Sequence, residues 1–131
     1  DVNIAESKLR DKTNDQLMPV IHFDFDQIKI KPAYIKLLLQ QSSCVMKALK
    51  SRNDMIIQIE GHADERGSDE YNMALGHRRA NIVANAIKVY LPDSSLARIF
   101  SFGEEFPLIR LSNKSAWGKN RRVEFTLLLK P

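Results

Sequence analysis

The segment from Met55 to Tyr90 restricts the possible folds of this chain more than any other. Residues 55–60 alternate between an apolar side and a mixed side, which predicts a β-strand. Gly61 and Gly67 bracket a short loop. From Asp69 onward, apolar residues recur at the spacing of an amphipathic helix, namely Tyr71, Leu75, Ile82, Ala86 and Tyr90. The loop should therefore lie at the edge of a sheet, with a helix beginning directly after it.

Other segments repeat these two patterns. Residues 20–26, 98–102 and 122–129 read as strands, and the first has Ile21, Phe23 and Phe25 on one face. A helix should begin at Pro32 and end near residues 52–54. Its apolar face would contain Ile35, Leu38, Leu39, Val45, Met46 and Leu49. Ser68 or Asp69 should cap the second helix and Pro92 should stop it. Residues 104–120 read as irregular, with one helical turn around 114–117.

The order of these elements is βαβαββ, and each has one apolar face. This pattern predicts an α+β fold, a two-layer α/β sandwich in which two main helices cover one face of a mixed four-stranded sheet. The 131 residues, 44% of them hydrophobic, suit one compact domain. We place that domain at residues 19–131, whereas the polar, charge-rich residues 1–18 read as a tail or tether.

Composition excludes some classes of function. The net charge of +4 is spread along the chain, and the basic residues are not interleaved with aromatic ones, so we expect no nucleic-acid partner. The single cysteine, Cys44, forms no intramolecular disulfide, and we expect its thiol to be buried in a helix face. No apolar run approaches the ~20 residues of a membrane span. Because the chain starts at Asp1, we read it as a mature or trimmed form that lacks a targeting or anchoring segment.

Several separated motifs carry a family resemblance. They are GHADERG at 61–67, EYN at 70–72, LG at 75–76, RRA at 78–80, SFGEEFPL at 101–108 and KNRRVEF at 119–125. In this order they resemble the OmpA-like peptidoglycan-binding domain and, within that family, the branch of peptidoglycan-associated lipoproteins (Pal). The resemblance covers roughly Pro19 to Leu129 and implies the fold of the OmpA C-terminal domain.

Asp64 in the loop and Arg79 in the helix are the strongest candidates for a binding site. By residue type alone they could equally be a turn cap and an ordinary ion pair. The resemblance implies that they hold the diaminopimelate of the peptidoglycan stem peptide. Asp64 would accept hydrogen bonds from its ammonium, and Arg79 and the amides at the helix start would bind its carboxylate. Both residues are expected at a surface, where truncation should leave the fold intact.

Further ligand-contacting positions are implied by the resemblance. Ala63 stands where other branches have threonine, which removes a hydroxyl contact. Phe25 fits both a ligand contact and, by alternation, the core. Leu75 is expected in the core rather than in a ligand wall, and Arg122 is expected to point to solvent. The further binding positions are Asn72, Asn120, Arg121, Ala63, Phe25 and Asp26.

Metal binding and catalysis are weaker hypotheses. His62, Asp64, Glu65 and His77 have the right chemistry for zinc, but no helical ligand pair completes a site, and a histidine hydrogen-bonded within the loop is the better interpretation of His62. Glu60, Asp64 and Glu65 could supply the acid pair of a glycosidase, but acids in such a pattern are equally common as solvated surface charges. No nucleophile stands beside a base. We therefore expect no enzyme, no catalytic residues, no metal and no cofactor.

The resemblance implies a non-covalent anchor of the outer membrane or an envelope complex to the cell wall, in the periplasm of a Gram-negative bacterium. A lipoprotein, a porin, a flagellar stator or a secretion component would each suit as the parent protein. Membrane contact would come only through a missing N-terminal lipid anchor or a fused domain. The alternative is a protein-interaction module with a Tol-type or secretion-system partner, in which peptidoglycan binding is secondary.

Overall fold

The computed structural model describes residues 7–8, 18, 20–51, 54–91 and 93–129. Most of the predicted 1–18 tail thus lies outside the described residues, as does Pro92, the expected helix stop. The helices and strands, in chain order, are β1 (Ser7–Lys8), β2 (Ile21–His22), α1 (Pro32–Ser51), β3 (Met55–His62), α2 (Asp69–Ile87), the 3-10 helices η2 (Lys88–Tyr90) and η3 (Ser94–Leu96), β4 (Ala97–Gly103), α3 (Lys114–Asn120) and β5 (Arg122–Leu129).

The sheet is mixed, as the sequence predicts. Its strand order is β1-β5-β3-β4, with β2 also paired to β5. β3 and β4 are parallel, whereas β5 runs antiparallel to β3, β2 and β1. The predicted α+β sandwich, with its βαβαββ order of main elements, is confirmed. The two-residue β1, within the predicted tail, is an addition that the sequence pattern does not indicate.

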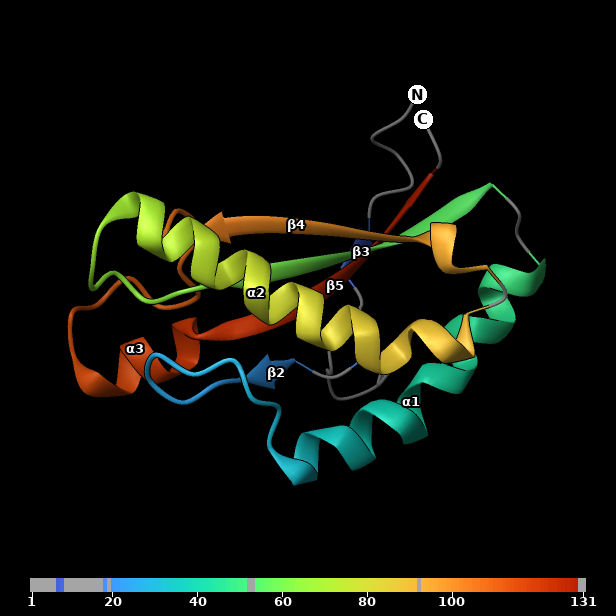
Figure 1. Cartoon of the computed structure of the whole chain (residues 1–131), viewed down its shortest axis with the longest axis horizontal. Helices are drawn as coiled ribbons and strands as arrows, with labels where there is room; N and C mark the ends of the chain where they lie inside the picture. Colours follow the sequence, from blue (N-terminus) through green and yellow to red (C-terminus); the bar gives the residue numbers. More distant parts are fainter. Residues whose placement is uncertain (1–6, 9–17, 19, 52–53, 92, 130–131) are drawn as a thin grey trace.

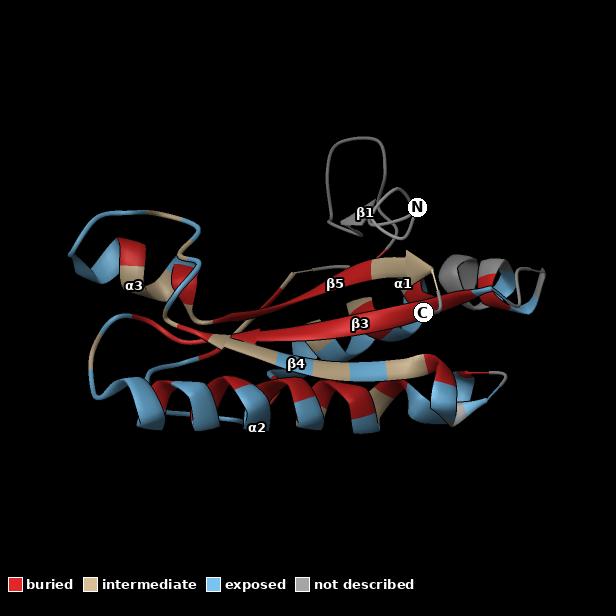
Figure 2. Cartoon of the chain, turned by 90° about the horizontal axis from the view of Figure 1, so that it is seen from above, coloured by how far each residue is buried: buried red, intermediate tan, exposed pale blue. Residues whose placement is uncertain are grey.

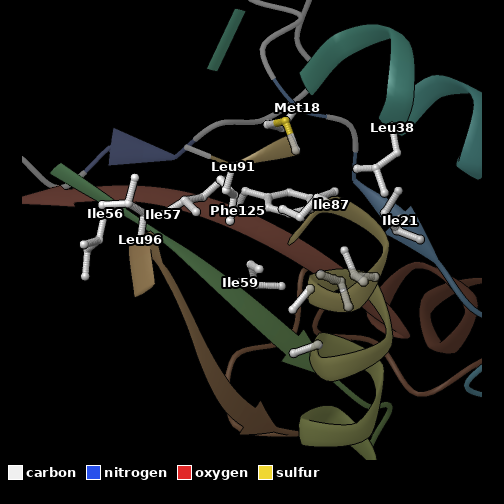
Figure 3. Packing of buried hydrophobic residues seen from close by; sticks show 14 of the residues in the cluster. Met18, Ile21, Leu38, Ile56, Ile57, Ile59, Ile87, Leu91, Leu96 and Phe125 are labelled. Carbon is white, nitrogen blue, oxygen red and sulfur yellow. The ribbon is translucent and has the colours of Figure 1, made fainter. Parts of the chain in front are cut away.

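The main core lies between the sheet and the long helices. α2 runs along the strands with its buried side turned toward them (Figures 1 and 2). On β3 and β5 the alternating residues face this core, and Ile59 pairs with Phe125 in register. Figure 3 shows Phe125 beside Ile87 of α2, and Leu38 of α1 close to Ile21. Burial of such apolar side chains is the main force that holds the two layers together.

Helical faces are less regular than the sequence pattern predicts. On α1, Leu38 and Leu49 are buried, but Ile35 and Leu39 are each 42% exposed. The side chains of Val45, Met46 and Cys44 lie outside the described part of the structure. Tyr71 on α2 and Tyr90 in η2 are exposed. The buried face of α2 follows another stripe: Asn72, Leu75, Gly76, Arg79, Ala80, Val83, Ala84 and Ile87. The expected apolar stripe of α2 was thus partly wrong, because two polar residues belong to the buried face.

The first predicted strand is cut short. Only Ile21 and His22 pair with β5, after which the amide of Phe23 donates to the carbonyl of Arg121 at 2.9 Å. The chain then turns, with Gln27 N donating to Asp24 O at 3.1 Å and Asp26 at a φ of 57°. Phe25 is consequently 57% exposed, so its predicted core position was wrong. The turn directs the segment after β2 toward the start of α2.

The opposite face of the central strands is polar but buried. Gln58 Nε2 and Thr126 Oγ1 donate to the same carboxylate oxygen of Glu60, at 2.9 and 2.6 Å. Arg122, expected to point to solvent, is also buried and pairs with Glu124. Every residue of β3 is therefore buried, on both sides of the strand.

Close contact between β3 and α2 depends on two glycines. A Cβ atom on Gly61 would lie 1.7 Å from the carbonyl oxygen of Gly76, and one on Gly76 would lie 2.3 Å from Ser101 Oγ. Only glycine permits this approach of two backbones. The contact brings the first half of α2 directly against the end of β3, where the loop with Asp64 begins.

Candidate functional site

A cavity of about 170 Å³ lies where β3 ends and α2 begins. Three segments far apart in sequence meet there: the turn after β2, the β3–α2 loop with the first half of α2, and the junction between α3 and β5 (Figure 1). Two carboxylates and three guanidinium groups line this cavity, so its formal charge is slightly positive. The lining residues are Phe25, Asp26, Asp64, Arg66, Gly67, Tyr71, Asn72, Leu75, Arg79 and Arg121.

Arg79 forms the inner wall of the cavity. It projects from the buried face of α2, and its side chain is 0% exposed. Its Nε donates to the carbonyl of Gln27 at 2.9 Å, and its terminal nitrogens donate to the carbonyls of His62 at 3.0 Å and Asp24 at 3.2 Å. Arg79 thus ties the turn after β2 to the end of β3. Its expected surface position was wrong, and its truncation should cost stability, since these three carbonyls would lose their donor.

Asp64 is also buried, with 5% of its side chain exposed. Arg66 binds it twice, from Nε to Oδ1 at 3.1 Å and from Nη2 to Oδ2 at 2.8 Å, and the Arg66 amide adds a third hydrogen bond at 3.0 Å. Arg121 Nη1 reaches Oδ2 at 3.3 Å. The carboxylate therefore lies in a ring of donors, and its predicted surface position was wrong.

Burial disfavours the charged forms of both Arg79 and Asp64, but the net pKa shifts have different causes. Burial lowers the pKa of Arg79 to about 10, and the charge of Arg121 acts in the same direction. For Asp64 burial would raise the pKa, but the hydrogen bonds from Arg66 and Arg121 outweigh it and hold the pKa below its ordinary value. Asp64 is consequently ionised at neutral pH, and the cavity keeps both signs of charge.

Arg66 covers the outer side of Asp64 and contacts two aromatic rings. Its guanidinium carbon lies 4.1 Å from the ring centroid of Phe25 and 4.1 Å from that of Trp117 on α3. Trp117 is held by Glu65, whose Oε2 accepts a hydrogen bond from Nε1 at 2.9 Å. Hydrogen bonds from Ser112 and Trp117 lower the pKa of Glu65. Glu65, considered above as a hydrolytic acid, thus orients an aromatic side chain.

The remaining predicted binding residues divide into two groups. Arg121 Nε donates to Phe23 O at 2.8 Å, Asn72 Nδ2 donates to Glu104 at 2.6 Å, and the Tyr71 hydroxyl donates to Asp26. The structure brings together in this cavity Asp64, Arg79, Asn72, Arg121, Phe25 and Asp26.

Ala63 and Asn120 instead line a second cavity of about 250 Å³. There the Asn120 side chain donates to the carbonyl of Ile109 and accepts from its amide, both at 2.9 Å. Through these two bonds the Asn120 side chain holds the loop before α3. It does not line the first cavity.

Sequence reasoning missed four contributors to the first cavity and its rim. Arg66 lies in the GHADERG motif and Tyr71 in the EYN motif. The position of Arg66 two residues after Asp64 is a usable signal, because an aspartate side chain commonly accepts a hydrogen bond from the backbone amide two residues later. Leu75 was expected in the core but lines the cavity. Trp117 gave no local signal, since only the tertiary structure brings α3 to the loop.

His62 differs from its expected role. It is the last residue of β3 rather than a loop residue, and its buried ring stacks on Phe102 with the centroids 5.3 Å apart. Among the residues that the structure describes, no group of three or more His, Cys, Asp or Glu side chains is arranged to hold a metal ion. Nor, within those same residues, is any helix long and apolar enough to cross a membrane.

Known proteins resemble this chain in sequence and in fold. The sequence profile of the OmpA family matches residues 22–121. The peptidoglycan-associated lipoprotein of Pseudomonas aeruginosa is 32% identical over 120 residues, covering 92% of this chain and 68% of that protein. The crystal structure of the corresponding lipoprotein from Burkholderia pseudomallei aligns with a TM-score of 0.71 and 34% identity, over 82% of this chain and 88% of the other.

A more distant structure shares the fold. The cell wall anchor of the type VI secretion system from P. aeruginosa aligns with a TM-score of 0.65 at 22% identity, over 85% of this chain and 80% of the other.

Proposed function

This chain belongs to the OmpA family, and from that premise we propose that it binds peptidoglycan non-covalently through the diaminopimelate of the stem peptide. The binding would anchor the outer membrane, or an envelope complex, to the cell wall. The proposed location is the periplasmic side of a Gram-negative outer membrane, and the proposed role is not enzymatic. The names of the similar proteins, peptidoglycan-associated lipoprotein and cell wall anchor, support this proposal.

The observation that carries the proposal is that Asp64, Arg79 and Arg121 line one small cavity. The side-chain end of diaminopimelate presents an ammonium and a carboxylate on one carbon, so its receptor needs an acceptor and a donor a few ångström apart. Asp64 would accept from the ammonium, and Arg121, together with the N–H groups of Arg79 that do not donate to the three backbone carbonyls, would bind the carboxylate. Neither contact requires a bond to break, which fits an anchor better than a hydrolase.

Sedimentation with purified peptidoglycan sacculi tests the proposal. The wild-type protein should sediment with them, and Asp64→Asn should bind at least roughly tenfold more weakly, because a charged hydrogen bond contributes about 1.5 to 3 kcal/mol. Asp93→Asn, an exposed acid near η3, is the matched control and should bind normally. Normal binding by Asp64→Asn would contradict the assigned site.

Ligand identity is tested with two kinds of cell wall. Sacculi that carry lysine in place of diaminopimelate supply the ammonium but no carboxylate on the same carbon. They should bind clearly more weakly than diaminopimelate sacculi. Equal binding to both walls would mean that the arginines of the cavity bind something other than that carboxylate.

The alternative, a protein-interaction module with a Tol-type or secretion-system partner, has one supporting observation. Phe106 and Leu111, in the connection between β4 and α3, are 55% and 61% exposed, and exposed apolar side chains of this size are common in interfaces. A module of this kind would stay in the supernatant when sacculi are sedimented. Release of soluble fragments from the sacculi would instead indicate an enzyme.

A further inference from the structure

The outer rim of the cavity has the composition of a cation-binding site. Asp64 supplies a carboxylate, and the rings of Phe25 and Trp117 each lie 4.1 Å from the same positive group. A carboxylate beside two aromatic faces is a favourable environment for an organic cation, because the negative ring faces add to the charge of the acid. The group in that environment is the guanidinium of Arg66, from the same loop as Asp64.

We propose that Phe25, Trp117 and Asp64 form a subsite for an organic cation, an ammonium or guanidinium group, and that Arg66 occupies this subsite as an internal competitor. Identifying the external cation as the ammonium of the stem peptide rests on the proposed function. The subsite itself rests only on the contacts of these four side chains.

Burial requires that something move before a ligand can reach Asp64. Only 5% of this side chain is exposed, and the covering group on its outer side is Arg66, itself 34% exposed. Arg121 approaches from the inner side and is tied to the carbonyl of Phe23. Arg66 donates no side-chain bond to a backbone carbonyl among its described contacts, so its guanidinium is the group that can leave without breaking the fold.

Loop geometry would survive this exchange. The Arg66 amide donates to Asp64 Oδ1 at 3.0 Å, and this bond does not depend on the side chain. The hydrogen bond from Trp117 Nε1 to Glu65 also does not involve the Arg66 side chain. The acid and one ring therefore stay in place when the guanidinium swings toward solvent. One cation replaces another in the subsite, so the charge within it is unchanged. Arg66 raises the apparent dissociation constant by the inverse of the fraction of time that it leaves the subsite free.

Methylguanidinium is a direct probe of the subsite. Trp117 is the only tryptophan in the chain, so its fluorescence reports on this rim alone. Removing the competitor in Arg66→Ala should let millimolar methylguanidinium change the Trp117 fluorescence, whereas the wild-type protein should respond at least roughly fivefold more weakly. Adding Asp64→Asn to Arg66→Ala should weaken that binding roughly tenfold or more. Arg98→Ala, an exposed arginine on β4, should behave as wild type.

Sacculus binding gives the second readout. Arg66→Ala should bind diaminopimelate sacculi more tightly than wild type, by roughly fivefold. If folded Arg66→Ala and Arg66→Gln both fail to respond to methylguanidinium, the subsite is refuted. If either variant loses sacculus binding as Asp64→Asn does, Arg66 positions Asp64 and does not compete with the ligand. Failure of wild-type protein to bind sacculi would instead refute the proposed function, while the methylguanidinium titration would still decide the subsite.

Discussion

The cavity has an inner wall and an outer rim, and each contains an arginine. On the inner wall, Arg79 is fully buried and donates to three backbone carbonyls. On the rim, Arg66 is one third exposed and contacts a carboxylate and two aromatic rings. Their pKa values shift in opposite directions: burial lowers that of Arg79, whereas the hydrogen bonds to Asp64 raise that of Arg66.

This difference distinguishes an arginine that holds backbone segments together from an arginine whose guanidinium a ligand cation can replace. The partners of Arg79 are backbone groups of two other segments, so removing it disturbs the positions of the β2–α1 turn and β3 together. The partners of Arg66 are side chains that a ligand cation could satisfy equally well. Residue type and motif membership do not distinguish the two arginines, but the identity of their acceptors does.

Replacement of Arg79 should have the largest effect. Arg79→Met keeps most of the side-chain volume but leaves three carbonyls without their donor, so the free energy of unfolding should fall by about 3 to 5 kcal/mol. Sacculus binding should be lost with it. Urea unfolding curves measure the change, and Arg78→Met, an exposed neighbour on α2, is the control. A loss below about 1 kcal/mol would remove the structural distinction between wall and rim.

Asp64, which faces both regions, should show a pH-dependent effect. Its pKa is lowered in the folded protein, so the ionised carboxylate stabilises the fold above its ordinary pKa of 3.8, and this stabilisation is lost as the pH falls through the folded-state value. Asp64→Asn should reduce the free energy of unfolding by about 1.5 to 3 kcal/mol at pH 7. The difference from wild type should shrink below about pH 4, and a difference independent of pH would contradict the ion-pair assignment.

Asn120 should affect stability but not ligand binding. Asn120→Ala removes two hydrogen bonds to Ile109, so the free energy of unfolding should fall by about 1 to 3 kcal/mol. Sacculus affinity should remain within about twofold of wild type, because Asn120 does not line the first cavity. Asn81→Ala, on the exposed side of α2, is the matched variant and should change neither property. A strong loss of binding would mean that the second cavity also contacts the ligand.

Replacement of Arg66 should have the smallest effect on stability. An ion pair with one partly exposed member contributes little, so Arg66→Ala should lower the free energy of unfolding by no more than about 1 kcal/mol. Arg98→Ala gives the background value for an exposed arginine. A loss comparable to that of Arg79→Met in the same urea series would show that the rim is as structural as the wall.

Sequence patterns determined the order and type of the main elements. Alternation in 122–129 and helical spacing from Asp69 are local properties, since a side chain's face follows directly from the period of its own element. The motif order also predicted that Asp64 and Arg79 lie near each other, because the loop leads directly into the helix, and both line the cavity. Alternation failed at Phe25, where a turn stabilised by contacts with distant segments interrupts the strand.

Only the tertiary structure decided which charged groups are structural and which are accessible. Arg79 lies on the helix face that packs against β3, and its acceptors at Asp24 and Gln27 are more than 50 residues away in sequence. The stack of Phe25, Arg66 and Trp117 joins three separate segments, and Asn120 faces Ile109 instead of the expected ligand site. Such contacts depend on how the layers pack, because the period of a helix or strand determines the direction of each side chain but not the partner that it contacts.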